Sequence, residues 1–160
     1  MAETNIHQYT VQEKLNKMDV DTIQVSPTVA TTDPQVDGNT LVDTTAIPNA
    51  VANASGTSIL QSISLVCNDH DNKDSVRIVF TSDSTVVASI DHAKAKSILG
   101  FVEVNKGVEV NSVSVIGSVE NIGMILRGDA DKKVYFYCQA RDVDAYAADD
   151  LTINFGIIKD

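Results

Sequence analysis

The stretch Lys132–Asp160, KKVYFYCQARDVDAYAADDLTINFGIIKD, decides the fold class of this chain. It contains two runs in which every second residue is apolar, with a polar connection between them. Successive side chains of a β-strand point to opposite faces, so this period predicts two strands, together forming a sheet that ends the chain. The residues expected to face inward are Val134, Phe136, Cys138 and Ala140 in the first run and Leu151, Ile153, Phe155 and Ile157 in the second.

Shorter apolar runs occur throughout the preceding hundred residues, and polar turn residues separate them. From Ile59 onward, these runs and the two at the C-terminus together predict about seven strands, and the spacing is typical of an antiparallel β-sandwich or jelly roll. Residues 90–97 form the one internal stretch with helix-forming composition, so a parallel α/β fold lacks the crossover helices that it needs. We therefore expect an all-β antiparallel sandwich, jelly-roll-like, with one short helix. The expected earlier strands cover residues 22–26, 59–67, 76–80, 98–104, 113–117 and 122–127.

The N-terminal third has a different composition from the rest of the chain. Val11, Leu15 and Met18 are at helical spacing, which predicts a short helix before residue 20. Residues 27–58 are rich in Thr, Asp, Asn, Ala, Pro and Gly, which indicates an extended loop. We therefore expect an extended N-terminal arm over residues 1–57 and a sandwich domain over residues 58–160. The apolar residues expected to anchor the arm on a partner are Ile23, Val25, Leu41, Val42 and Ile47.

The charge and the hydropathy of the chain limit its partners. Its 160 residues include 22 acidic and 12 basic side chains, for a net charge of −10. This charge repels phosphate backbones and disfavours nucleic-acid binding. No apolar run approaches the roughly 20 residues that span a bilayer, and the first residues lack the pattern of a secretory signal, so we expect no membrane association and folding in a cytoplasm.

The two cysteines, Cys67 and Cys138, are both in apolar, strand-like runs. We expect free buried thiols, because cysteine packs as a small hydrophobic residue and a cytoplasm is reducing. Their spacing alone also permits a disulfide between neighbouring strands.

Polar clusters supply few candidates for catalysis or metal binding. Asp69, His70 and Asp71 follow one another and are more typical of a solvated turn than of a cation site, because consecutive side chains rarely converge. The sequence contains no Walker A loop, nucleophile elbow, zinc-protease helix or Cys-X-X-Cys pair, which favours a non-enzyme with no cofactor and no metal. The other candidates are Asp91 and His92 before the short helix, the acidic loop with Asp142, Asp144, Asp149 and Asp150, and His7.

Three tyrosines gather near the C-terminus and are candidates for partner binding. Tyr135 and Tyr137 share one face of a predicted strand, and Tyr146 follows in the next loop. Half-buried tyrosines at the edge of a core are also frequent at protein interfaces.

Five phrases of the sequence, in this order, resemble small β-sandwich virion proteins of tailed bacteriophages, of the head decoration (cement) type. The resemblance covers roughly residues 36–160, and the ending YAADDLTINFG is its most distinctive part. The phrases are Ser58–Leu65 (SILQSISL), Val76–Phe80 (VRIVF), Ser97–Val104 (SILGFVEV), Val119–Leu126 (VENIGMIL) and Tyr146–Gly156 (YAADDLTINFG).

The resemblance implies a structural role on the virion. It implies a protein that is made in the bacterial host cytoplasm and binds the capsid exterior, with the major capsid protein as its partner. Copies of the chain are expected to associate with one another, as trimers at local three-fold positions of the lattice. A head-fibre, tail or baseplate protein that binds a glycan near Tyr146, Asp144 and Asp149 remains an alternative. A small hydrolase using Asp69 and His70, or Asp91 and His92, is a further one.

Overall fold

A computed structural model describes residues 20–29, 39–68, 75–85, 94–111, 114–141 and 146–159. These residues form nine strands and one short 3-10 helix, η1 (Lys94–Ser97). The strands are β1 (Val20–Val25), β2 (Thr40–Ile47), β3 (Thr57–Cys67), β4 (Ser75–Thr81), β5 (Ile98–Asn105), β6 (Val108–Glu109), β7 (Val115–Arg127), β8 (Val134–Ala140) and β9 (Leu151–Lys159).

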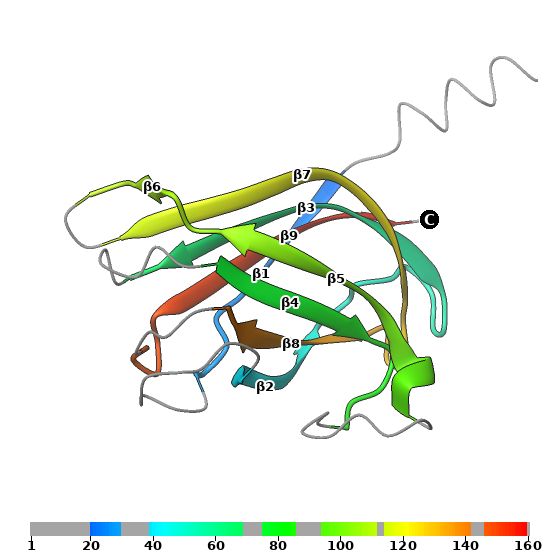
Figure 1. Cartoon of the computed structure of the whole chain (residues 1–160). Helices are drawn as coiled ribbons and strands as arrows, with labels where there is room; N and C mark the ends of the chain where they lie inside the picture. Colours follow the sequence, from blue (N-terminus) through cyan, green and yellow to red (C-terminus); the bar gives the residue numbers. More distant parts are fainter. Residues whose placement is uncertain are drawn as a thin grey trace, which may run out of the picture.

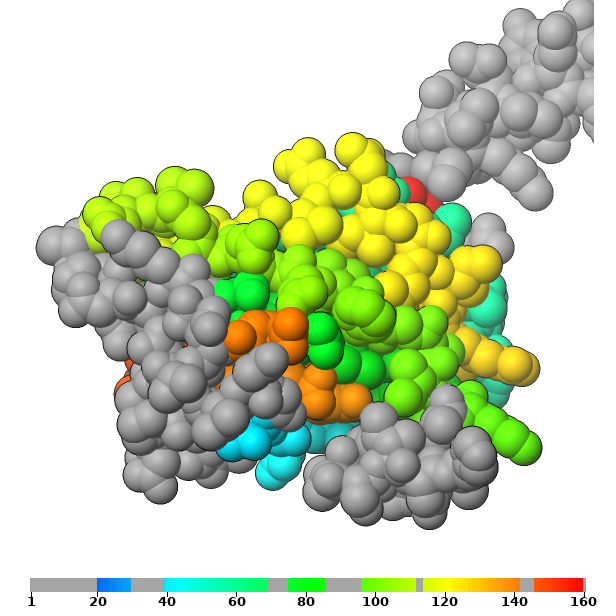
Figure 2. All heavy atoms as spheres, viewed as in Figure 1, coloured from blue at the N-terminus to red at the C-terminus, as the bar shows by residue number. Residues whose placement is uncertain are grey.

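The strands form two antiparallel sheets that pack face to face (Figure 1). One sheet has five strands in the order β1-β9-β3-β7-β6, and the other has four in the order β2-β8-β4-β5. In the space-filling view the residues of β5, in green, adjoin those of β7, in yellow (Figure 2). There the side chain of Met124 lies against Gly100, where an added Cβ would be 2.8 Å from Cε of Met124. The predicted all-β sandwich is confirmed.

The pairing of the eight longer strands defines a jelly roll. The first pairs with the last (β1 with β9), the second with the seventh (β2 with β8), the third with the sixth (β3 with β7) and the fourth with the fifth (β4 with β5). A long hairpin that rolls up on itself has this pattern, and the β3–β9 and β4–β8 pairs then close the two sheets. Jelly rolls occur in viral capsid proteins, lectins and cupins, so the topology alone does not select one function.

The two strands at the C-terminus lie in different sheets, and the prediction that they form one sheet is wrong. Strand β8 belongs to the four-stranded sheet and β9 to the five-stranded sheet, and their inner faces meet across the core. The ring centroids of Phe136 and Phe155 are 5.1 Å apart, and that of Phe80 lies 5.9 Å from that of Phe155. The inward residues predicted for both strands are confirmed, because all eight are at most 1% exposed.

The predicted extended loop over residues 27–58 is wrong between Thr40 and Ile47. Strand β2 pairs with β8 there, and its anchors Leu41, Val42 and Ile47 are fully buried. Threonine favours strands, and an edge strand tolerates the polar residues that suggested a loop. Strand β1 pairs with β9, so the five-stranded sheet, like the four-stranded one, contains residues that precede position 57. The expected boundary between residues 57 and 58 therefore does not divide the fold into separate parts. The helix predicted before residue 20 lies outside the described residues.

Two predicted strands, 113–117 and 122–127, overlap one continuous strand, β7. Near the start of the second predicted strand, Asn121, Ile122 and Gly123 form a bulge opposite the single residue Gln61. Asn121 and Gly123 have positive φ values of 58° and 67°. Such a bulge breaks the period of two, which is why the sequence suggests two strands. In the predicted helix, residues 94–97 form a 3-10 turn and residues 90–93 lie outside the described part of the chain.

Candidate interaction surfaces

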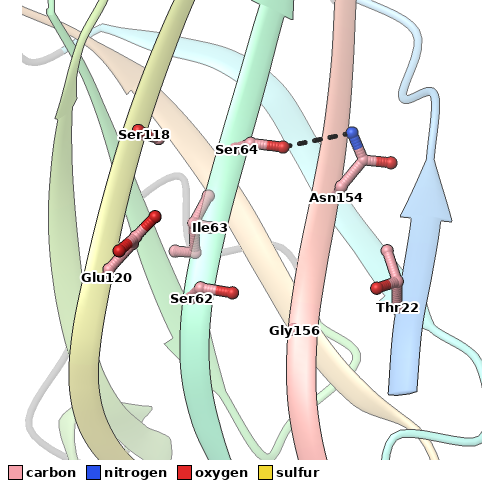
Figure 3. A pocket seen from close by; sticks show the side chains of 8 residues that line it. All are labelled: Thr22, Ser62, Ile63, Ser64, Ser118, Glu120, Asn154 and Gly156. Carbon is pink, nitrogen blue, oxygen red and sulfur yellow. Dashed lines mark hydrogen bonds between the residues drawn. The ribbon is translucent and has the colours of Figure 1, made fainter. Parts of the chain in front are cut away.

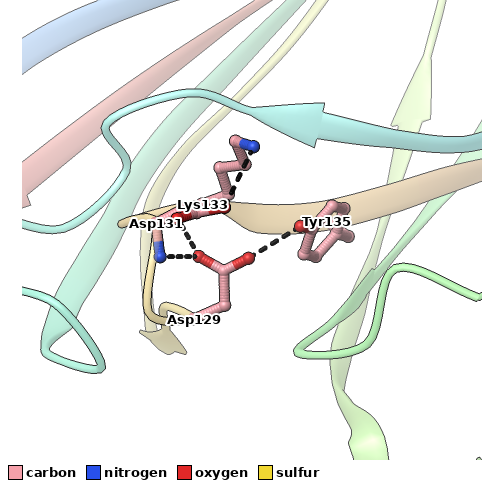
Figure 4. Close-up of polar contacts among 4 residues, drawn as sticks. All are labelled: Asp129, Asp131, Lys133 and Tyr135. Carbon is pink, nitrogen blue, oxygen red and sulfur yellow. Dashed lines mark hydrogen bonds and ion pairs between the residues drawn. The ribbon is translucent and has the colours of Figure 1, made fainter.

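Tyr135 of β8 contacts a compact polar turn, residues 129–133, that precedes the strand (Figure 4). Its hydroxyl donates to Oδ2 of Asp129 at 2.7 Å, while the backbone N–H groups of Asp131 and Lys133 donate to Oδ1 at 2.8 and 2.9 Å. The tyrosine hydroxyl and these amides lower the pKa of Asp129. The same hydrogen bond raises the pKa of Tyr135 to about 12. The hydroxyl of Tyr135 therefore orders this turn, and its ring is half-buried.

Tyr137 lies on the outer face of the four-stranded sheet, in a small apolar cluster. It is 4% exposed and packs with Val79, and the half-buried side chain of Ile98 packs against both residues. Burial is the main cause that raises the pKa of Tyr137.

Beside this cluster, Phe101 of β5 is 58% exposed, and Cζ of Arg77 lies 5.1 Å from its ring centroid. Glu103 accepts a hydrogen bond from Nε of Arg141 and lies 3.6 Å from Nη2 of Arg77. The charged side chains of this patch are two arginines and one carboxylate. We name it the arginine–aromatic cluster, and its members are Arg77, Phe101, Glu103, Tyr137 and Arg141.

Tyr146 is buried, so the structure does not place a glycan site on its ring. Nζ of Lys106 donates to its hydroxyl at 2.9 Å and lies 4.6 Å from its ring centroid. Lys106 itself is fully buried. Lys106 was not a candidate at the sequence level, because a lysine between Asn105 and Gly107 is typical of an exposed turn.

The predicted arm anchors do not form an exposed surface. Leu41, Val42 and Ile47 belong to the core and are unavailable to a partner. Ile23 and Val25 are half-buried and pack against the same core from β1. Their apolar character reflects burial inside the sandwich.

The outer face of the five-stranded sheet has a shallow polar depression of about 150 Å³ (Figure 3). Nδ2 of Asn154 donates to Oγ of Ser64 at 3.3 Å across its floor. Gly156 of β9 has no side chain to fill the depression. A Cβ at this position would lie only 2.2 Å from Oγ of Ser62. Alternating small polar residues are typical of any exposed strand, so no local pattern in the sequence indicates this depression. It is lined by Thr22, Ser62, Ile63, Ser64, Ser118, Glu120, Asn154 and Gly156.

Next to the depression, four apolar side chains form a row across four hydrogen-bonded strands. The register pairs Val20 with Ile158, Ile158 with Ile59, and Ile59 with Ile125. They point outward because alternating neighbours, such as Ile157, Leu60 and Leu126, are fully buried. Val20, Ile59 and Ile125 are 48%, 36% and 66% exposed. We name this feature the apolar row (Val20, Ile59, Ile125 and Ile158).

The two cysteines are not joined by a disulfide, as predicted. Cys67 of β3 and Cys138 of β8 are both buried, and they belong to different sheets. Burial raises the pKa of the Cys138 thiol, which keeps it protonated and unreactive at neutral pH.

The polar candidates from the sequence are only partly placed. Asp150 accepts a hydrogen bond from the N–H of Ala147 at 2.5 Å and orders a turn, and Asp149 is exposed. The other candidates, Asp69, His70, Asp71, Asp91, His92, Asp142, Asp144 and His7, lie outside the described residues. Within the described ranges, no three acidic, histidine or cysteine side chains group together as a metal site. A search of the same ranges finds no helix with the length and apolar character that crossing a membrane requires.

Comparisons with known proteins find likeness in shape only. No family model and no curated protein matches the chain. Among solved structures, a chain from Tomato Aspermy Virus is 12% identical, with 94% of this chain and 92% of that chain covered and a TM-score of 0.38. Chains from Desmodium yellow mottle tymovirus and from the nodavirus of the prawn Macrobrachium rosenbergii are 16% and 11% identical. For these two the coverage is 86% of this chain and 85% and 91% of theirs, with TM-scores of 0.30 and 0.34. TM-scores this low carry no argument about function, and the fold rests on the strand order of the chain itself.

Proposed function

We propose that this chain is a structural protein of a tailed-bacteriophage virion that decorates the capsid exterior and cements the lattice of the major capsid protein. The phrases between Ser58 and Gly156 that resemble decoration proteins support this role. Each of the five phrases coincides with much of one strand of the jelly roll, in β3, β4, β5, β7 and β9. A fold of this class is compatible with a coat or decoration protein.

The observation that carries the proposal is the arginine–aromatic cluster on the outer face of the four-stranded sheet. The side chain of Phe101 is exposed, and the guanidinium group of Arg77 lies over its ring. Aromatic residues and arginine are enriched at the energetic centres of protein interfaces. The cluster therefore suits the attachment of the sandwich to an apolar and acidic site on a capsid surface.

Attachment in many copies strengthens a weak contact. A capsid lattice presents the same site many times, and three copies gathered around each local three-fold position would hold one another in place. The net charge of −10 would keep the protein from binding the genome while it is made in the bacterial cytoplasm.

Co-sedimentation with capsids that lack the protein tests this proposal. We expect the purified chain to pellet with capsids, and Phe101→Ala to weaken binding by about tenfold or more. Val110→Ala is the matched control, because Val110 is 55% exposed and lies outside the cluster. The decoration proposal is wrong if the unmodified chain does not bind capsids, and the cluster is not the contact if both variants bind equally well.

The polar depression favours a second candidate function, a head-fibre, tail or baseplate protein that binds a glycan. Its hydroxyl and amide groups and the carboxylate of Glu120 are the kinds of groups that bind sugar hydroxyls. A glycan array with hits that disappear in Asn154→Ala would support this function. An array without hits would remove it.

A further inference from the structure

Among the described residues, the apolar row is the one place where apolar side chains on an outer face line up across four strands. Val20, Ile59 and Ile125 are exposed, and Ile158 is half-buried. Elsewhere on this face, the cross-strand positions next to the row are Thr22, Gly156, Ser62 and Glu120. Isolated exposed apolar residues are ordinary, whereas an aligned set is typical of a surface that another molecule covers.

Opposite charges flank the row on β7. Arg127 lies two residues beyond Ile125 on the same face and pairs with Thr57, whereas Glu120 lies on the other side of the row and pairs with Ser62. Both side chains are exposed. Along one strand the order is therefore acidic, apolar, basic.

We propose that a second copy of this chain covers the apolar row, about a two-fold axis that runs along the row. In the second copy, such an axis reverses the direction that runs along the strands, from Glu120 to Arg127. Each position along the row then faces the same position in the other copy. The axis stacks the row on its own copy, with Ile125 against Ile125, and brings Glu120 of each copy to Arg127 of the other. The face is thus complementary to itself in apolar character and in charge, as a two-fold interface requires.

The size of the face predicts a weak dimer. Four strands about 4.8 Å apart give a width of about 19 Å, and the distance from Glu120 to Arg127 is similar, so each copy buries about 400 Å². Stable interfaces bury about 800 Å² per partner. The dimer should therefore depend on concentration in the free protein. The inference concerns self-association and holds whether or not the virion role is correct.

Light scattering coupled to size-exclusion chromatography, over a range of concentrations, tests the inference on the full chain. We expect the mass to rise from one chain towards two. Ile125→Asp should raise the dissociation constant about tenfold or more. Val110→Asp, at a site that is 55% exposed and lies away from the row, should leave the dissociation constant unchanged. Circular dichroism confirms that each variant is folded.

A charge exchange separates this arrangement from other occupants of the row. Glu120→Arg and Arg127→Glu should each weaken the dimer, and the double variant should restore it, because each copy then again presents opposite charges to the other. A monomer at every concentration, an unchanged dimer in Ile125→Asp, or no recovery in the double variant would each overturn the proposal. Capsid binding is measured separately, so failure here leaves the decoration proposal standing.

Discussion

At the scale of single residues, the period of two predicted where side chains point, and it did not predict what they meet. Tyr135 and Tyr137 share the outer face of β8 as expected, yet one orders a turn and the other fills an apolar cluster. Tyr146 meets Lys106, which comes 40 positions earlier. A contact between residues so distant in the chain leaves no local pattern, so a buried lysine–tyrosine pair could not be predicted.

The bond between Asp129 and Tyr135 predicts a pH-dependent stability. Asp129 has a lowered pKa in the folded chain, so its contribution is present above pH 4 and is lost as the pH falls through the lowered value. Tyr135 has a pKa raised to about 12, so its contribution is present below pH 10 and is lost as the pH rises towards 12. Tyr135→Phe should therefore lower the free energy of unfolding most between about pH 5 and pH 9, as urea titrations at several pH values would measure.

Tyr137→Phe is the control for this prediction. The pKa of Tyr137 is raised mainly by burial, so this variant should leave the acid side of the stability profile unchanged. A stability difference between Tyr135→Phe and the unmodified chain that stays constant from pH 3 to pH 7 would contradict the role given to Asp129.

At the scale of elements, strands were predictable where apolar residues alternate and were lost where the alternation fails. Strand β2 was missed because Asp43, Thr44 and Thr45 interrupt its apolar residues at the edge of a sheet. Strand β7 was divided in two because its bulge at 121–123 shifts the period. Both errors come from local interruptions of the apolar period. The continuity of each strand is evident only from its hydrogen bonds to the partner strand.

The bulge predicts a specific cost for one glycine. Gly123 has a φ of 67°, and a Cβ added there would meet no atom within 4 Å, so only backbone strain opposes a substitution. Gly123→Ala should lower the free energy of unfolding by about 1 kcal/mol. Gly107→Ala is the matched control, because it also has open space around it but no positive φ, and it should be neutral or slightly stabilising. Equal effects of the two variants in urea titrations would show that the backbone conformation at position 123 does not strain an alanine.

Residues 1–19 are the part of the expected N-terminal arm that precedes the first strand, β1. A deletion that tests the role of this segment must stop before Val20, because β1 is hydrogen-bonded to β9. Removing residues 1–19 should leave the thermal unfolding of the sandwich unchanged and weaken its binding to capsids. Unchanged capsid binding would show that the segment makes no contact with the lattice.

At the scale of the whole molecule, the fold class followed from the sequence and the topology did not. The number of strands and their turns indicated a sandwich. The pairing of first strand with last depends on contacts across nearly the whole chain, which no periodicity reports. For the same reason β8 and β9, consecutive in sequence, were not recognised as facing layers. The topology separates two outer faces, one with the arginine–aromatic cluster and one with the apolar row, so the two proposed contacts use different surfaces of the molecule.

The most direct test of the proposed decoration role is cryo-electron microscopy of virions assembled in the presence of this protein. The account predicts density for the jelly roll on the outside of the capsid, with the outer face of the four-stranded sheet and Phe101 against the major capsid protein. Density for this chain inside the shell, in the tail, or nowhere on the particle would contradict it.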